Sequence, residues 1–222
     1  MTHPLHDPAN HTSVVIEKPF TPTTAEADTL IALAKEKNRI LTVFQNRRYD
    51  SDFRTLRHLM SLDPSPFGKV TEFQNHYDMD NPPWVVKWTA AEPELGESGS
   101  GFYLPDSTCS ARAVLTLTNT ILNTGEGMLY GLGTHSIDQT LQLFGKPANV
   151  TAFLRVLRDP SIPNGADDSF TIVLQYDPKG DQKDLIATVK TTIVSPMPMD
   201  RQIKYSLRGT SGSFVKVRQP FT

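Results

Sequence analysis

Two short motifs carry the side chains with the most evident chemical potential. Glu17-Lys18-Pro19 follows the apolar run Val14 to Ile16, and Gly-Leu-Gly-Thr-His-Ser-Ile-Asp occupies residues 131–138. A lysine ammonium can stabilise negative charge on a reacting oxygen, and an imidazole can take up or release a proton near neutrality. Lys18 is therefore a candidate for stabilising charge on a reacting oxygen, and His135 is a candidate for proton transfer. Two simpler roles stay open, a solvated lysine at a strand end and a histidine that caps or packs a helix.

Further polar candidates lie close to these motifs. Arg47, Arg48 and Tyr49 directly follow a second apolar run, and Asp138 comes one helical turn after His135. Asp138 would share a helical face with His135 and could orient its ring. The arginines and Tyr49 could contact a substrate or cofactor, or they could form a solvated turn with salt bridges.

The first part of the chain has a β-α-β pattern. Val14 to Ile16 and Ile40 to Phe44 are predicted strands, and the capping box Thr23-x-x-Glu26 begins the helix between them. Such a unit belongs in a parallel sheet with a right-handed crossover. Parallel sheets normally have both faces covered, so two strands and one helix indicate that this unit needs a further packing partner. The residues predicted to share the buried helix face are Ala27, Leu30, Ile31 and Ala34.

The rest of the chain predicts helices on an antiparallel sheet. One helix begins at Ser51 and a strand covers residues 69–77. A second helix covers residues 134–144, with Ile137, Leu141 and Phe144 on one side and His135, Asp138 and Gln142 on another. Alternating apolar residues predict five more strands, the last two joined as a hairpin through residues 209–212. These strands cover residues 150–156, 170–176, 187–193, 203–207 and 213–217.

The composition excludes several classes of protein. A net charge of −2 argues against a general nucleic-acid or anionic-membrane surface. The single cysteine, Cys109, excludes an internal disulfide and a cysteine-cluster metal site. The sequence has no apolar run long enough to span a membrane, and its first residues lack the features of a signal peptide. We therefore expect a cytoplasmic protein.

Two segments do not fit a packed domain. Residues 1–12, with three scattered histidines, are expected to be an irregular leader rather than a metal site. Between Gly99 and Gly125 only Asp106 and Arg112 are charged, and the segment sustains no periodicity. Structureless segments of this length are uncommon inside compact domains. We therefore interpret residues 96–125 as an insertion.

The order of the motifs resembles the Gfo/Idh/MocA family of NAD(P)-dependent oxidoreductases, the glucose-fructose oxidoreductase and inositol dehydrogenase group. The resemblance rests on Glu17-Lys18-Pro19, on residues 45–49 and on Gly133-Thr134-His135-x-x-Asp138. It implies an α/β (α+β) fold. Residues 13–48 would be a remnant of the Rossmann nucleotide-binding domain, and residues 49–222 a C-terminal α/β domain for substrate binding and oligomerisation. The second domain would contain a mostly antiparallel open sheet with helices on one face.

The resemblance also implies roles for individual residues. Lys18 would lie beside the nicotinamide of NAD or NADP and stabilise the substrate oxygen, and Glu17 and Pro19 would belong to the same cofactor site. His135 would be the general acid–base, and Arg47, Tyr49 and Asp138 would orient the substrate. One departure is Gly131, where many members of the family carry an aspartate.

The function implied by the resemblance is hydride transfer between nicotinamide and a sugar-like or other secondary alcohol or ketone. Expected partners are a small-molecule substrate and a second copy of the chain at the open sheet face, without nucleic acid, membrane or metal. No Gly-x-Gly-x-x-Gly turn precedes Glu17, although a dinucleotide site requires one. The alternative is therefore a non-catalytic fragment or a regulatory or scaffold protein on the same fold.

Overall fold

The computed structural model describes residues 13–21, 23–82, 127–158 and 167–218. The predicted leader and the suspected insertion lie outside these residues. The described residues form two units that divide between Gln45 and Asn46, and each is considered by itself. Residues 46–48, which we assigned to the first domain, fall in the second unit, where Arg47 and Arg48 are bonded to α5 (Thr134–Phe144). The functional division of the chain into domains stays a prediction.

The first unit is the predicted β-α-β arrangement. Strands β1 (Val14–Ile16) and β2 (Leu41–Val43) pair in parallel, and helix α1 (Thr24–Glu36) connects them. Thr23 caps α1, because its hydroxyl accepts from the Glu26 amide at 3.3 Å while the Glu26 carboxylate accepts from the Thr23 amide at 3.2 Å. The capping box read from the sequence is confirmed.

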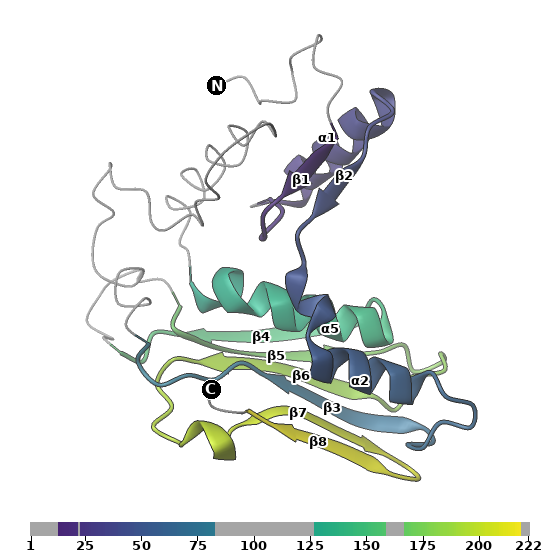
Figure 1. The fold of residues 1–222 in the computed structure, drawn as a ribbon, viewed down its shortest axis with the longest axis vertical. Coiled ribbons are helices and arrows are strands. Elements are labelled where there is room, and N and C mark those ends of the chain that lie inside the picture. Colours follow the sequence, from purple (N-terminus) through teal and green to yellow (C-terminus); the bar gives the residue numbers. More distant parts are fainter. Residues whose placement is uncertain (1–12, 22, 83–126, 159–166, 219–222) are drawn as a thin grey trace. The chain divides into compact units, whose positions relative to one another are not determined.

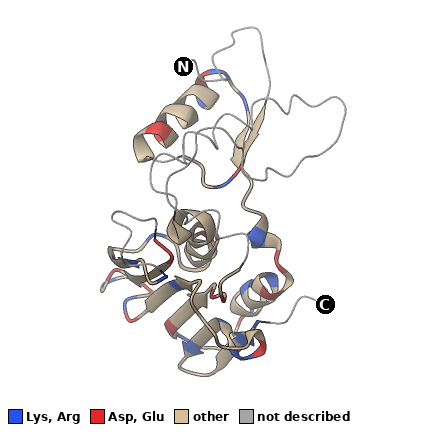
Figure 2. Ribbon diagram, turned by 90° about the vertical axis from the view of Figure 1, so that its left-hand side faces the viewer, with Lys and Arg blue, Asp and Glu red and all other residues tan. Residues whose placement is uncertain are grey.

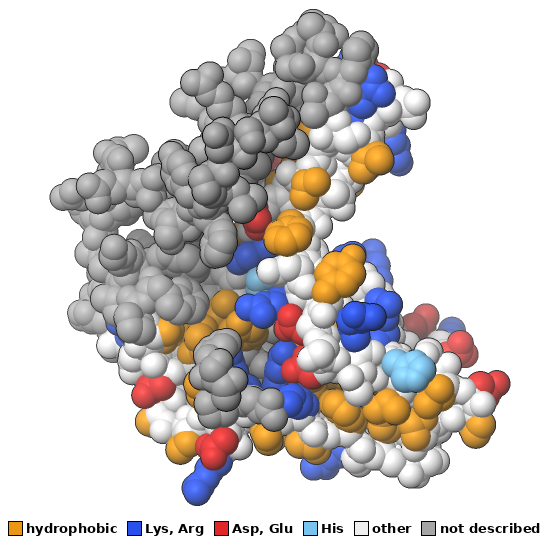
Figure 3. Space-filling view, in the orientation of Figure 1, with side chains coloured by type: hydrophobic (Ala, Val, Ile, Leu, Met, Phe, Trp, Pro, Cys, Tyr) orange, Lys and Arg blue, Asp and Glu red, His pale blue; other side chains and the backbone are white. Residues whose placement is uncertain are grey.

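Helix α1 covers only one face of this two-stranded sheet. Ile16 and Leu30 are buried, whereas Val15, Ile40 and Phe44 are 56%, 69% and 49% exposed. Apolar side chains are visible on the surface of this unit in Figure 3. Ile31, which was predicted to face inward with Leu30, is 40% exposed, because a two-stranded sheet is too narrow to cover the whole apolar side of the helix.

The second unit is built on one six-stranded sheet with the order β4-β5-β6-β3-β7-β8. Every neighbouring pair is antiparallel except β3 and β6, which are parallel. The prediction of a mostly antiparallel sheet is confirmed, including the hairpin between β7 and β8, in which the Gly209 amide donates to the Gly212 carbonyl. The strands are β3 (Val70–His76), β4 (Asn149–Arg155), β5 (Ser169–Gln175), β6 (Ile186–Thr192), β7 (Ile203–Gly209) and β8 (Ser213–Val217).

Two helices, α2 (Ser51–Met60) and α5 (Thr134–Phe144), pack on the same face of this sheet. Phe53 of α2 contacts the ring of Tyr205 (centroids 6.5 Å apart), and Phe144 of α5 contacts Phe73 (5.2 Å). Phe73 and Tyr205 lie on neighbouring strands and stack at 6.3 Å. The core therefore lies between the two helices and the central strands.

Two of the apolar patterns that predicted these elements contain exposed residues. Val150 and Leu154 of β4 are 59% and 52% exposed, because β4 is an edge strand. Leu141, predicted on the apolar side of α5, is 37% exposed. The buried residues of α5 are instead mostly polar, and they are His135, Ser136, Gln139, Thr140 and Phe144.

The surface shows mixed charge. Figure 2 shows Lys and Arg interspersed with Asp and Glu over the six-stranded unit, as the net charge of −2 suggests. Within the described ranges, no helix combines the length and the apolar character needed to cross a bilayer.

We expect Phe73→Ala to lower the free energy of unfolding by about 3–5 kcal/mol, since it would leave a cavity at the centre of the core. Phe73 is fully buried, whereas Phe153, on the edge strand β4, is 55% exposed. Urea unfolding of both alanine variants measures the difference. A loss in Phe153→Ala as large as in Phe73→Ala would contradict this description of the core.

Candidate active site

The helix that carries His135 begins in a π-helical turn, η5 (Leu129–Gly133), that runs directly into α5. Gly133 lets this turn pack against the sheet, because a Cβ atom at that position would lie 2.8 Å from a ring carbon of Phe170. The need for a glycine at position 133, two residues before His135, therefore follows from its close contact with β5. π-Helical turns are rare and often occur at functional sites.

Asp167 fixes the start of the same turn. Its backbone carbonyl accepts from the Met128 amide at 2.7 Å, and its carboxylate accepts from the Leu129 amide at 2.9 Å. These bonds satisfy amides that the first turn of a helix leaves without partners. Burial raises the pKa of Asp167, and the backbone hydrogen bond from Leu129 opposes that shift.

His135 is buried, at 7% exposure, in the first turn of α5. One turn later lies Gln139, which is also buried. The Gln139 carboxamide oxygen accepts from the Tyr205 hydroxyl at 3.0 Å and from Asn75 Nδ2 at 3.3 Å. Asn75 Nδ2 also donates to the Ser136 carbonyl at 3.0 Å. Side chains of β3 and β7 thereby hold the histidine helix at a defined place on the sheet.

The short 3-10 helix η2 (Asn46–Tyr49) is bonded to α5 at two adjacent residues. Gln139 Nε2 donates to the Arg47 carbonyl at 2.8 Å. Arg48 makes a bidentate ion pair with Asp138, from Nε to Oδ2 at 2.8 Å and from Nη2 to Oδ1 at 2.6 Å. This hydrogen bond to Asp138 raises the pKa of Arg48. The structure thus brings Asp138, a predicted site residue, to Arg48.

The other predicted residues of η2 differ in their surroundings. Arg47 Nη1 lies 3.5 Å from Asp50 Oδ1, and its Nη2 donates to the Tyr77 hydroxyl at 3.3 Å. Tyr49 is 76% exposed. Arg47 is therefore part of a local ion-pair network, whereas the Tyr49 ring is open to solvent. Contact of either residue with a substrate stays a prediction.

Lys18 lies in the first unit, two residues beyond the last residue of β1, between exposed Glu17 and partly buried Pro19. Lys18 itself is partly buried, and the Lys18–Pro19 peptide is cis. It follows the carboxyl end of a parallel strand, where open α/β sheets bind ligands. Since His135 belongs to the second unit, proximity of Lys18 to His135 stays a prediction.

Sequence reasoning missed the polar residues that hold the histidine helix, namely Asn75, Gln139 and Tyr205. A signal was present, because Gln139 follows His135 by four residues and so shares its helical face. The choice between a buried and an exposed glutamine depends on Asn75 and Tyr205, which come from distant strands. The described residues contain no group of three or more His, Cys, Asp or Glu side chains that could hold a metal ion.

Comparison with known proteins identifies the class to which this fold and site belong. Residues 115–215 match the model of the GFO/IDH/MocA C-terminal domain. The match begins inside residues 96–125, whose interpretation as an insertion stays a prediction. The chain belongs to the Gfo/Idh/MocA family, as the motifs predicted.

Several relatives align with most of this chain. An uncharacterised oxidoreductase of Schizosaccharomyces pombe, C115.03, is 35% identical over 204 residues, which cover 91% of this chain and 46% of the relative. The scyllo-inositol 2-dehydrogenase (NADP(+)) IolW of Bacillus subtilis is 32% identical over 163 residues, 73% of this chain and 36% of IolW. The solved structure of YhhX, an uncharacterised oxidoreductase of Escherichia coli, is 33% identical with a TM-score of 0.63, covering 92% of this chain and 46% of that one. The chain spans about half the length of such relatives.

We expect Gln139→Leu to lower the free energy of unfolding by about 2–4 kcal/mol, because it would remove the acceptor of the buried Tyr205 hydroxyl and one of the two donors to the Arg47 carbonyl. Gln142→Leu, on the exposed side of the same helix, is the matched control and should change it by less than about 0.5 kcal/mol. Urea unfolding measures both. Equal effects would show that the Gln139 network does not hold the helix.

The raised pKa of Asp167 predicts a pH dependence of stability. Because the folded protein holds this proton more tightly than the unfolded chain, the contribution of Asp167 to the free energy of unfolding falls as the pH rises above its ordinary pKa of 3.8. The amount by which the free energy of unfolding of wild type exceeds that of Asp167→Asn should therefore decrease from acidic to neutral pH. Urea titrations across that interval test this, with exposed Asp200→Asn as the control. A difference in free energy of unfolding that grows with pH would contradict this prediction.

Proposed function

We propose that this chain provides the catalytic half of an NAD(P)-dependent oxidoreductase that acts on a sugar-like or other secondary alcohol or its ketone. The observation that carries the proposal is the placement of His135, buried at the start of a helix whose position is fixed by Gln139, in a family whose relatives are oxidoreductases. The name of IolW, an NADP(+)-dependent dehydrogenase, supports a nicotinamide cofactor.

The residues present fit one end of such a cofactor. Lys18 lies just beyond the carboxyl end of β1, the edge at which parallel sheets bind nucleotides. Glu17, Lys18 and Pro19 would hold the nicotinamide end. Contacts to the cofactor's pyrophosphate, which a Gly-x-Gly-x-x-Gly turn makes in other dinucleotide sites, are not assigned to these residues.

We assign two tasks to this chain, which are to stabilise charge on the substrate oxygen and to transfer the proton of its hydroxyl group. A nicotinamide cofactor, when bound, would accept a hydride from the substrate carbon or supply one to it. In the oxidation direction, the His135 imidazole takes the hydroxyl proton as the C–H bond breaks and the C=O bond forms. The Lys18 ammonium donates a hydrogen bond to the same oxygen and stabilises its developing negative charge. Reduction reverses each step.

The alternative, a non-catalytic regulator or scaffold, is favoured by Gly131, where many members of the family have an aspartate. It predicts a folded protein that transfers no hydride. The two functions are therefore separated by a transfer assay.

The assay measures transfer of deuterium from 4-deuterated NADH or NADPH to a panel of ketoses and inososes, detected by mass spectrometry. We expect transfer by wild type, about 10²–10⁴-fold less by His135→Asn and about 10²–10³-fold less by Lys18→Met. Lys35→Met, on the exposed surface of α1, is the matched control and should keep wild-type activity. Transfer that survives in both site variants would contradict the assigned roles, and no transfer by folded wild type would favour the regulator.

A further inference from the structure

The chain enters the second unit through η2, and this short helix is held from two sides. On one side are Arg48, paired with Asp138, and the Arg47 carbonyl, which accepts from Gln139. Asp138 and Gln139 are adjacent residues of α5. Two successive residues of the entry turn are therefore bonded to two successive residues of the helix that carries His135.

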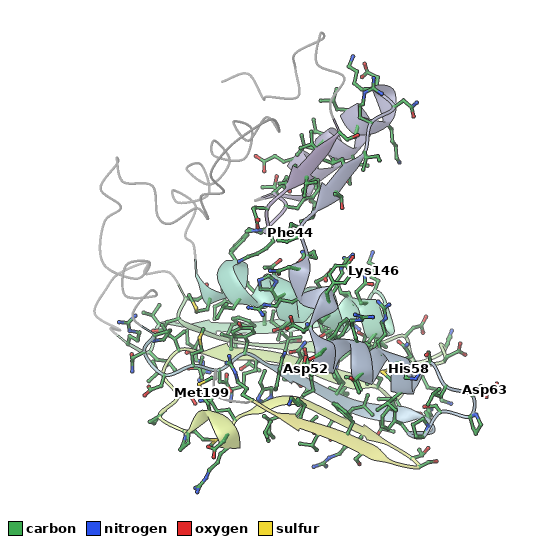
Figure 4. The ribbon with its side chains drawn as sticks, viewed as in Figure 1. Phe44, Asp52, His58, Asp63, Lys146 and Met199 are labelled. Carbon is green, nitrogen blue, oxygen red and sulfur yellow. The ribbon has the colours of Figure 1, made fainter. Side chains whose placement is uncertain are left out.

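On the other side, η2 is tied to the sheet through charged residues that follow it. Lys204 of β7 lies 3.2 Å from Asp50 Oδ2 and 2.8 Å from Asp52 Oδ2. Arg47 reaches both Asp50 and the Tyr77 hydroxyl. Figure 4 shows Asp52 at the start of α2. The turn is thus fixed against the sheet as well as against α5.

The Arg48–Asp138 pair differs from an ordinary surface ion pair. The Asp138 side chain is only 15% exposed, and both of its oxygens accept from the guanidinium. Exposed pairs with a single contact contribute little, whereas bidentate arginine–carboxylate pairs fix geometry as well as distance. Asp138 therefore has a defined structural partner other than the His135 ring that we predicted it to orient.

We propose that Arg48 and Asp138 are positioning residues that lock the entry turn η2 onto the histidine helix. Only Phe44 and Gln45 separate β2 from η2 in the sequence. The pair thereby fixes the turn through which the chain enters the unit that carries His135. The consequence for catalysis rests on the proposed function, whereas the lock itself does not.

The lock is tested by amide hydrogen exchange of residues 46–50 in the full chain. Asp138→Asn and Arg48→Met should each raise the exchange rate of these amides by about tenfold, and the double variant should raise it no further, because the two residues act as one pair. Arg48→Lys, which keeps the charge but cannot make both hydrogen bonds of the guanidinium to Asp138, should give an intermediate increase in exchange rate. Asp184→Asn breaks a more exposed ion pair with Lys69 and should leave this segment unchanged.

Unchanged exchange in folded Asp138→Asn, or effects of the single variants that multiply in the double variant, would overturn the proposal. A second readout separates positioning from a direct role beside His135. If wild type transfers hydride, Asp138→Asn should lower kcat without moving the pH profile. A displaced pH profile would instead assign Asp138 to the His135 ring and overturn the positioning role. If wild type transfers none, the exchange data still decide whether the lock exists, and only the proposed function fails.

Discussion

The Gln139 carboxamide is the interaction on which the arrangement of the second unit depends. It is buried between α5 and the sheet, and a buried amide requires partners for both its oxygen and its nitrogen. Asn75, Tyr205 and the Arg47 carbonyl supply them from β3, β7 and η2. Because each partner comes from a different part of the chain, one side chain fixes the helix relative to both the sheet and the entry turn.

This constraint explains why a buried helix face is mostly polar. An apolar face would pack against the sheet with a less specific register, since hydrophobic contacts have no preferred direction. Hydrogen bonds with defined geometry allow fewer arrangements. His135 lies one turn from Gln139, so its position follows from the same contacts. A candidate proton-transfer group must be positioned accurately, because small displacements strongly reduce the rate of catalysis.

Much of the fold follows from local sequence signals. The capping box at Thr23 and Glu26, the helix from Thr134 to Phe144 and the β7–β8 hairpin were predicted with correct or nearly correct boundaries, because caps, glycines and alternation act over a few residues. The buried face of α5 was not predicted, because it depends on Asn75 and Tyr205. The exposure of Val150 and Leu154 does not follow from the sequence pattern either, since alternation predicts a strand but does not show that it lies at the edge of a sheet. Among the predicted site residues, the Asp138 partner was found only in the structure, whereas family membership followed from the motifs themselves.

The central claim is that this chain contains a functional nicotinamide site. The most direct measurement is calorimetric titration of NAD⁺, NADH, NADP⁺ and NADPH into the 222-residue protein, after cooperative urea unfolding has shown that it is folded. We expect saturable binding of at least one dinucleotide in the micromolar range, weakened by Lys18→Met and unchanged by Lys35→Met. A folded protein that binds none of the four would contradict the enzyme proposal for this polypeptide and support the regulator.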